Sequence, residues 1–64
     1  MRSDFDRLKA TLTNCVRYGP ESQGCQRAHL LGRITFVESI HATRGQKLRE
    51  IFSRIRWADG KPPH

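Results

Sequence analysis

The sequence predicts a small all-α module built from three helices. Three segments carry apolar residues at helical spacing, and residues that cap or break helices stand between them. The chain has 64 residues, of which 36% are hydrophobic, and this is little for a self-sufficient core. We therefore expect one helical domain over residues 1–57 that is either oligomeric or a piece of something larger.

The first helix is expected over residues 3–18. Ser3 followed by Asp6 resembles a capping box, with aspartate in place of the usual glutamate. Gly19 followed by Pro20 is a strong stop signal, because glycine adopts the left-handed cap and proline cannot continue a helix. The apolar stripe of this helix consists of Phe5, Leu8, Leu12, Cys15 and Val16.

The second helix is expected over residues 27–40, after a polar connector at residues 19–26. Gly32 weakens this helix by about 1 kcal/mol. A glycine at such a position indicates a place where another backbone comes close. The apolar face is marked by Leu30, Ile34, Val37 and Ile40, with Leu31 and Phe36 at its edges.

The third helix is expected over residues 43–56, because Thr43 followed by Gln46 fits a capping box. Trp57 is expected to close its apolar stripe at the C-terminal end. Residues 58–64 contain a glycine and two prolines, and we expect them to form a disordered tail. The stripe itself has the unbroken helical pattern Leu48, Ile51, Phe52 and Ile55.

The charge of the chain favours a polyanionic partner. Twelve basic residues, nine of them arginine, stand against six acidic ones, and the net charge is +6. Arginine suits forked contacts to phosphate, so nucleic acid is the expected partner. Trp57 would be able to stack on a base, but a lone tryptophan beside an apolar stripe is more commonly a packing residue. The candidate backbone-contact residues are Arg27, Arg33, Lys47, Arg49, Arg54 and Arg56.

Other chemistry is poorly supported by the sequence. The spacing of Cys15, Cys25, His29 and His41 is wrong for a zinc finger, and nothing places a cysteine beside a histidine for nucleophilic catalysis. No glycine-rich phosphate loop and no carboxylate pair suited to two metal ions is present in the sequence. We find neither an apolar run long enough for a membrane span nor a secretory signal. A cytoplasmic location with two reduced thiols is the expectation.

Three short elements follow one another in order along the chain. Gly-Pro ends the first segment at residues 19–20, HLLGRI lies at residues 29–34, and GQKL lies at residues 45–48. With these elements, residues 4–57 resemble the C-terminal thumb region of bacterial retron-type reverse transcriptases, which are RNA-directed DNA polymerases. In that family a leucine-rich helix ends in Gly-Pro. An element of the His-Leu-x-Gly-Arg/Lys-Ile/Leu type follows, and a last helix of the Gly-x-Lys-Leu type ends the domain.

Two features depart from that family. The Tyr-x-Asp-Asp signature of the nucleotidyltransferase palm is absent from the sequence, as are the fingers and palm themselves. The connector before the Arg-Ala-His element is also shorter than is usual in the family, with only residues 24–26 between Gln23 and Arg27. The resemblance therefore implies a thumb fragment that is inactive alone and needs no cofactor of its own, since magnesium would belong to the missing palm.

The resemblance also implies partners. A polymerase thumb holds the template–primer duplex by sugar and phosphate, so the expected ligand is an RNA–DNA or RNA duplex, bound without sequence preference. The other expected partner is the rest of the polymerase, against which an apolar surface would pack, and no membrane is involved. The residues expected to make that packing are Leu30, Ile34, Phe52 and Trp57.

Two alternatives remain open at the level of the sequence. The first is a small helix-turn-helix DNA-binding regulator that uses residues 44–56 as its recognition helix. It predicts a stable fold, dimerisation and sequence preference. The second is a protein-interaction peptide whose charge serves only solubility. The thumb interpretation is favoured because all three segments match in order.

Overall fold

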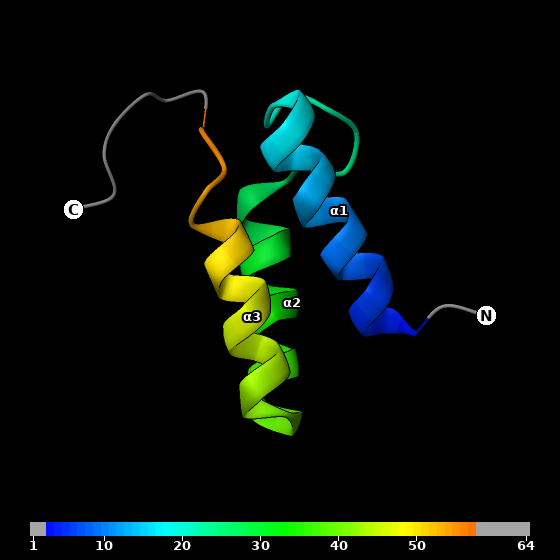
Figure 1. Cartoon of the computed structure of the whole chain (residues 1–64), viewed down its shortest axis with the longest axis vertical. Helices are drawn as coiled ribbons and strands as arrows, with labels where there is room; N and C mark the ends of the chain where they lie inside the picture. Colours follow the sequence, from blue (N-terminus) through cyan, green and yellow to red (C-terminus); the bar gives the residue numbers. More distant parts are fainter. Residues whose placement is uncertain (1–2, 58–64) are drawn as a thin grey trace.

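A computed structural model describes residues 3–57 of the chain. It consists of helices α1 (Asp4–Tyr18), α2 (Arg27–Ile40) and α3 (Ala42–Phe52), with no strand among the described residues, so the all-α prediction is confirmed. Successive helices run in opposite directions, and α2 and α3 lie side by side (Figure 1). The predicted disordered tail at residues 58–64 lies outside the described part of the chain. Within that part, no helix has the length and apolar character needed to cross a membrane.

Both ends of α1 follow the signals in the sequence. The Ser3 hydroxyl accepts a hydrogen bond from the Asp6 backbone N–H at 3.2 Å and caps the helix. At the other end, the Gly19 N–H donates to the Cys15 carbonyl at 3.0 Å. Gly19 has a φ of +101°, a conformation that favours glycine, so the helix ends where the Gly-Pro pair predicted.

A single residue, His41, joins α2 to α3. It has an extended backbone, its N–H donates to the Val37 carbonyl at 2.7 Å, and its Nδ1 accepts from the Arg44 N–H at 3.3 Å. His41 thus ends α2 and caps α3, and the prediction that Thr43 caps the third helix is wrong. Thr43 lies inside the first turn of α3. The chain reverses direction at His41, and the His41 imidazole therefore caps the N–H groups at the start of α3 in place of the Thr43 hydroxyl.

The third helix is also shorter than predicted. It ends at Phe52 and not at Arg56, and residues 53–54 form a turn. The Ile55 N–H donates to the Phe52 carbonyl at 3.1 Å, and the Ile55 side chain is only 6% exposed. The last predicted turn of the helix is therefore absent, and Ile55 reaches the core from a non-helical segment.

Two glycines have opposite surroundings. A Cβ atom at Gly45 would lie 2.6 Å from the Glu38 Cα and 2.8 Å from the Glu38 backbone nitrogen, so this glycine is what allows α3 to contact α2 so closely. A Cβ atom at Gly32 would meet no atom within 4 Å. The close approach predicted for Gly32 is therefore not made by the described part of this chain, and it occurs at Gly45 instead.

One buried cluster holds the three helices together. All three contribute side chains to it, and partly buried rings of Phe5, Phe52 and Trp57 cover its edges. The predicted apolar stripes are confirmed for most of their length, but Val16 on α1 is 38% exposed, and Phe36 and Ile40 on α2 are 65% and 69% exposed. The buried members are Leu8, Leu12, Cys15, Leu30, Ile34, Leu48 and Ile55.

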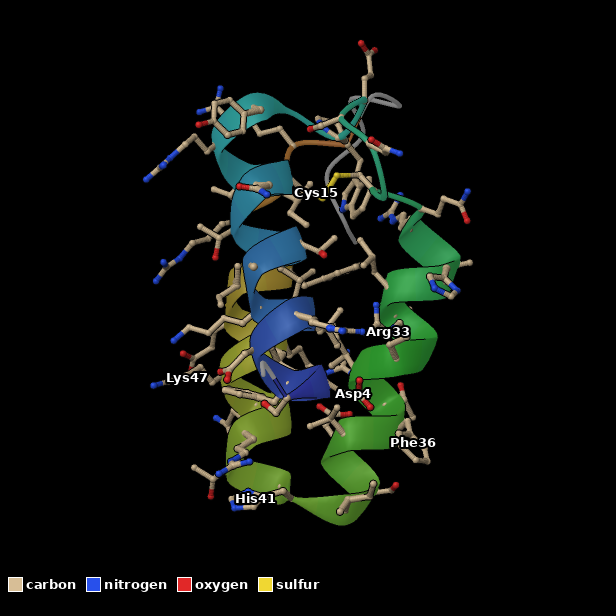
Figure 2. All side chains as sticks on the ribbon, turned by 90° about the vertical axis from the view of Figure 1, so that its right-hand side faces the viewer. Asp4, Cys15, Arg33, Phe36, His41 and Lys47 are labelled. Carbon is tan, nitrogen blue, oxygen red and sulfur yellow. A yellow bond between two sulfur atoms is a disulfide. The ribbon has the colours of Figure 1, made fainter. Side chains whose placement is uncertain are left out.

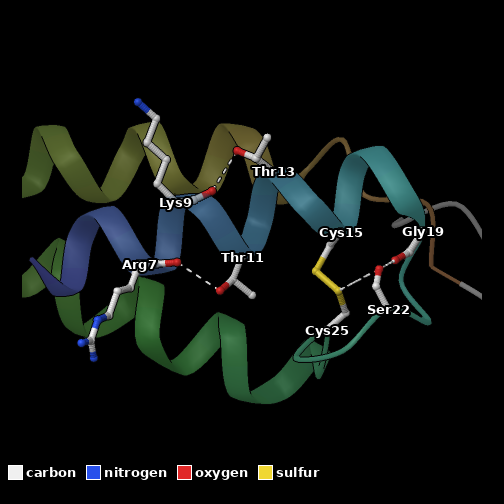
Figure 3. The surroundings of a disulfide bond; sticks show 8 residues. All are labelled: Arg7, Lys9, Thr11, Thr13, Cys15, Gly19, Ser22 and Cys25. Carbon is white, nitrogen blue, oxygen red and sulfur yellow. Dashed lines mark hydrogen bonds between the residues drawn. A yellow bond between two sulfur atoms is a disulfide. The ribbon is translucent and has the colours of Figure 1, made fainter. Parts of the chain in front are cut away.

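A disulfide between Cys15 and Cys25 ties the end of α1 to the start of α2 (Figure 3). The two Cα atoms are 6.0 Å apart, within the usual range for a disulfide. Cys15 is fully buried, as the apolar stripe predicted, but the prediction of two reduced thiols is wrong. That prediction followed from the compartment, and the spacing of the two cysteines along the chain gave no sign that the turn at residues 19–24 would bring their sulfur atoms together.

Candidate nucleic-acid interface

Three of the predicted phosphate-contact residues belong to segments that lie at one end of the module. At this end α1 finishes, α2 begins and the segment after α3 passes by (Figure 1). Arg27 is the first residue of α2, and Arg54 and Arg56 belong to the C-terminal segment. Arg17, which is not among the residues predicted from the sequence, is in the last turn of α1 at the same end. We call Arg17, Arg27, Arg54 and Arg56 the basic end.

Trp57 anchors this end to the core. Its ring centroid is 5.4 Å from that of Phe52, and the Arg27 guanidinium lies 5.3 Å from the Trp57 ring. Such a distance is typical of a cation–π contact. Trp57 therefore packs on the core of this module and holds the C-terminal segment, with Arg56 next to it, beside the start of α2.

The N-terminus of α2 adds to the positive character of the basic end. Gln26 occupies the cap position but makes no side-chain hydrogen bond to the helix, and the first turn contains no acidic residue. The first backbone N–H groups of a helix point outward and favour an anion. A phosphate at this end would thus meet N–H groups as well as arginine side chains.

Arg49 is engaged within the module. Its Nε and Nη2 donate to the two carboxylate oxygens of Glu38 at 2.6 and 2.9 Å. These hydrogen bonds lower the pKa of Glu38 below its ordinary value. The forked pair fastens α3 to α2, so Arg49 serves the fold and is a poor candidate for phosphate contact.

Arg33 and Lys47 lie apart from the basic end and from each other. Figure 2 shows Arg33 in the space between α1 and α2, and Lys47 on α3 at the outer edge of the molecule. Arg33 is partly buried, whereas Lys47 is exposed. The six predicted basic residues therefore do not form one surface.

The four residues predicted to pack on another polymerase domain serve the core of this module. Leu30 and Ile34 are 1% and 0% exposed, so they have no surface left for another domain. Phe52 and Trp57 are partly buried against the same core. Leu31, Phe36 and Ile40 are the exposed large hydrophobic residues of α2. Helical spacing placed Leu31 and Phe36 at the edge of the apolar face, whereas it placed Ile40 on the face itself.

The described residues offer no assembled metal site. Within residues 3–57 no three His, Cys, Asp or Glu side chains come together. Cys15 and Cys25, two of the four residues considered for zinc, are bonded to each other.

Comparison with known proteins adds no assignment. No family model, no curated protein and no solved structure matches this chain. The resemblance to reverse-transcriptase thumbs thus stays a prediction from the sequence.

Proposed function

We propose that this chain is a thumb fragment of a reverse transcriptase (an RNA-directed DNA polymerase) that contacts the backbone of an RNA–DNA or RNA duplex. The observation that carries the proposal is the basic end, where α1 ends at Arg17 and Tyr18, α2 begins at Arg27 without a side-chain cap, and the segment with Arg54 and Arg56 follows α3. Arginines and helix N–H groups bind phosphate and carry no sequence information. Contact of this kind suits a module that follows the shape of a duplex.

The connection between α2 and α3 favours this proposal over a helix-turn-helix regulator. In a helix-turn-helix motif a turn of about three or four residues sets two helices at about 90–120°. Here His41 alone separates the helices, and they run side by side in opposite directions. Gly45, packed against Glu38, and the Glu38–Arg49 pair fix this arrangement.

A salt titration tests the proposal. Affinity for an RNA–DNA hybrid should fall linearly with salt concentration on logarithmic axes, with a slope of about −3 for three or four phosphate contacts. Two hybrids of unrelated sequence should bind within about threefold of each other, because backbone contacts do not read bases. A preference of about a hundredfold for one sequence would contradict the proposal.

The isolated chain should not polymerise. The carboxylates that hold two metal ions in a polymerase belong to the palm, and the chain has no Tyr-x-Asp-Asp element. Primer extension on an RNA template should therefore give no more product than a reaction without protein. Template-dependent incorporation by the pure chain would refute this part of the proposal.

We place the module inside the cell, where a reverse transcriptase works. The Cys15–Cys25 disulfide would then meet a reducing environment. The proposal requires that the three helices persist when the disulfide is reduced.

A further inference from the structure

A groove lies between the first half of α1 and the face of α2, and it runs from Ala28 near the start of α2 to Arg44 at the start of α3. Its volume is about 730 Å³, and side chains from α1, α2 and the start of α3 line it. Figure 2 shows Arg33 in this groove, Asp4 at the start of α1 and Phe36 on α2. We call it the α1–α2 groove and define it by Phe5, Arg33, Phe36, Val37, Ile40 and Arg44.

The apolar surface of the groove is not needed by the fold. Phe36 and Ile40 are one helical turn apart and are 65% and 69% exposed. Phe5 and Val37 extend this surface toward the core, against which they are partly buried. Five large hydrophobic residues of the described chain are exposed, and Phe36 and Ile40 are the two of them that line this groove. An exposed apolar patch of this kind marks an interaction site.

Gly32 lies one turn before Phe36 and also lines the groove. The fold leaves room for a methyl group there, since no atom lies within 4 Å of a Cβ built at this position. A glycine inside a helix costs up to about 1 kcal/mol relative to alanine. The helix would be more stable with alanine, so Gly32 is better explained by an incoming backbone than by packing within this module.

The charges around the groove select the occupant. Two guanidinium groups, of Arg33 and Arg44, line it together with one carboxylate, that of Asp4. The Arg44 guanidinium is held 5.3 Å from the Phe5 ring, which fixes a positive charge beside the apolar floor. A second copy of this chain would bring its own charge of +6 and the same two guanidinium groups, so electrostatics disfavours self-association.

We propose that the α1–α2 groove binds an amphipathic helix from an acidic partner protein. Gly32, Phe36 and Ile40 recur every four residues, and this row extends over about 12 Å at 1.5 Å per residue. Two to three turns of a helix match that length, with apolar anchors on Phe36 and Ile40. Glutamates beside those anchors would pair with Arg33 and Arg44. This proposal does not depend on the thumb function.

Three designed peptides test the proposal. The probe is a helical Leu/Glu peptide of about 16 residues, with leucines at positions i, i+3, i+4 and i+7. The controls are a Leu/Lys peptide with the same leucines and a scrambled Leu/Glu peptide. In an NMR titration of the whole chain, the Leu/Glu peptide should bind at least about tenfold more tightly than either control. The shifted backbone signals should centre on residues 32–44.

Variants locate the binding site. The double change Phe36→Ala and Ile40→Ala should weaken the binding of the Leu/Glu peptide at least about tenfold. Tyr18→Ala is the matched control, because Tyr18 is 68% exposed and lies on α1 outside the groove. Arg44→Glu should weaken binding as well, whereas Lys47→Glu on the outer side of α3 should not. Circular dichroism confirms that each variant keeps its helices.

Several results would overturn the proposal. One is a Leu/Glu peptide that binds no better than its scrambled form, and another is an affinity that does not change in the double alanine variant. Dimerisation through Phe36 and Ile40 in sedimentation experiments would show that a second copy occupies the groove. Single-stranded RNA that produces the same pattern of shifts would assign the groove to nucleic acid. None of these results bears on duplex binding at the basic end.

Discussion

At the scale of single residues, the two helical glycines predict opposite effects of alanine. Gly45→Ala should destabilise the fold by about 1–3 kcal/mol, because its methyl group would overlap the backbone of Glu38. Gly32→Ala should stabilise the fold by up to about 1 kcal/mol, since the position is helical and open. Urea unfolding of the two variants measures both values. Effects of the same sign would contradict the packing described for α2 and α3.

The Glu38–Arg49 pair predicts a dependence of stability on pH. Hydrogen bonds from Arg49 lower the pKa of Glu38 in the folded state, so the pair stabilises the fold above the ordinary glutamate pKa of about 4.3. This stabilisation should disappear as the pH falls through the lowered pKa, when the folded carboxylate takes up its proton. Glu38→Gln should remove that part of the acid dependence.

The measurement is the difference between the two proteins. Urea unfolding is followed at a series of pH values from neutral to acidic. The free energy of unfolding of the wild-type chain should exceed that of the Glu38→Gln variant at neutral pH, and this difference should shrink at low pH. All other residues are the same in the two proteins, so their contributions cancel in the comparison. A constant difference across the series would mean that the pair does not form in solution.

At the scale of the elements, the disulfide predicts a response to reducing agents. Cys15 and Cys25 are ten residues apart in sequence, and a bridge that closes so short a loop contributes about 2–3 kcal/mol. A phosphine reductant should lower the free energy of unfolding by this amount. The Cys15→Ala, Cys25→Ala double variant is the control and should not respond to the reductant. An unchanged wild-type stability would indicate that the bridge is absent in solution.

The sequence predicted the elements well where the signal was local. The Ser3 cap and the Gly19 stop fixed α1, and helical spacing fixed α2 over residues 27–40. The start of α3 was missed because a histidine is an uncommon cap and a threonine and a glutamine three residues apart imitated a capping box. Its end was missed because Ile55 is buried by the turn that precedes it, which no helical period describes.

At the scale of the whole molecule, the small core predicts modest stability. Within residues 3–57 the interior rests on seven buried hydrophobic side chains and one disulfide. We expect thermal unfolding, followed by circular dichroism, to have its midpoint below about 70 °C, within or near the usual range of mesophilic domains. A cooperative transition above that temperature would show a self-sufficient core and would favour a free-standing regulator over a fragment.

The distribution of charge was harder to predict than the fold. The composition indicated a polyanionic partner, but the surface on which Arg33 or Lys47 lies depends on how α1 packs against α2 and α3. The engagement of Arg49 depends on Glu38, eleven residues away across the hairpin. Arg17 was overlooked because it is in the last turn of α1 and shares this end of the module with Arg27 only through the packing of α2 beside α1. Long-range packing decides each of these positions.

The central claim is that the basic end contacts the nucleic-acid backbone. The most direct measurement is the affinity for an RNA–DNA hybrid of a triple variant, Arg27→Ala, Arg54→Ala and Arg56→Ala, beside the double variant Arg33→Ala and Lys47→Ala. We predict that the triple variant binds at least about tenfold more weakly, with a salt slope flatter by about one unit for each arginine that no longer touches a phosphate. The double variant should bind within about threefold of the wild-type chain. Equal affinity of the triple variant and the wild-type chain, or an equal weakening in both variants, would contradict the claim.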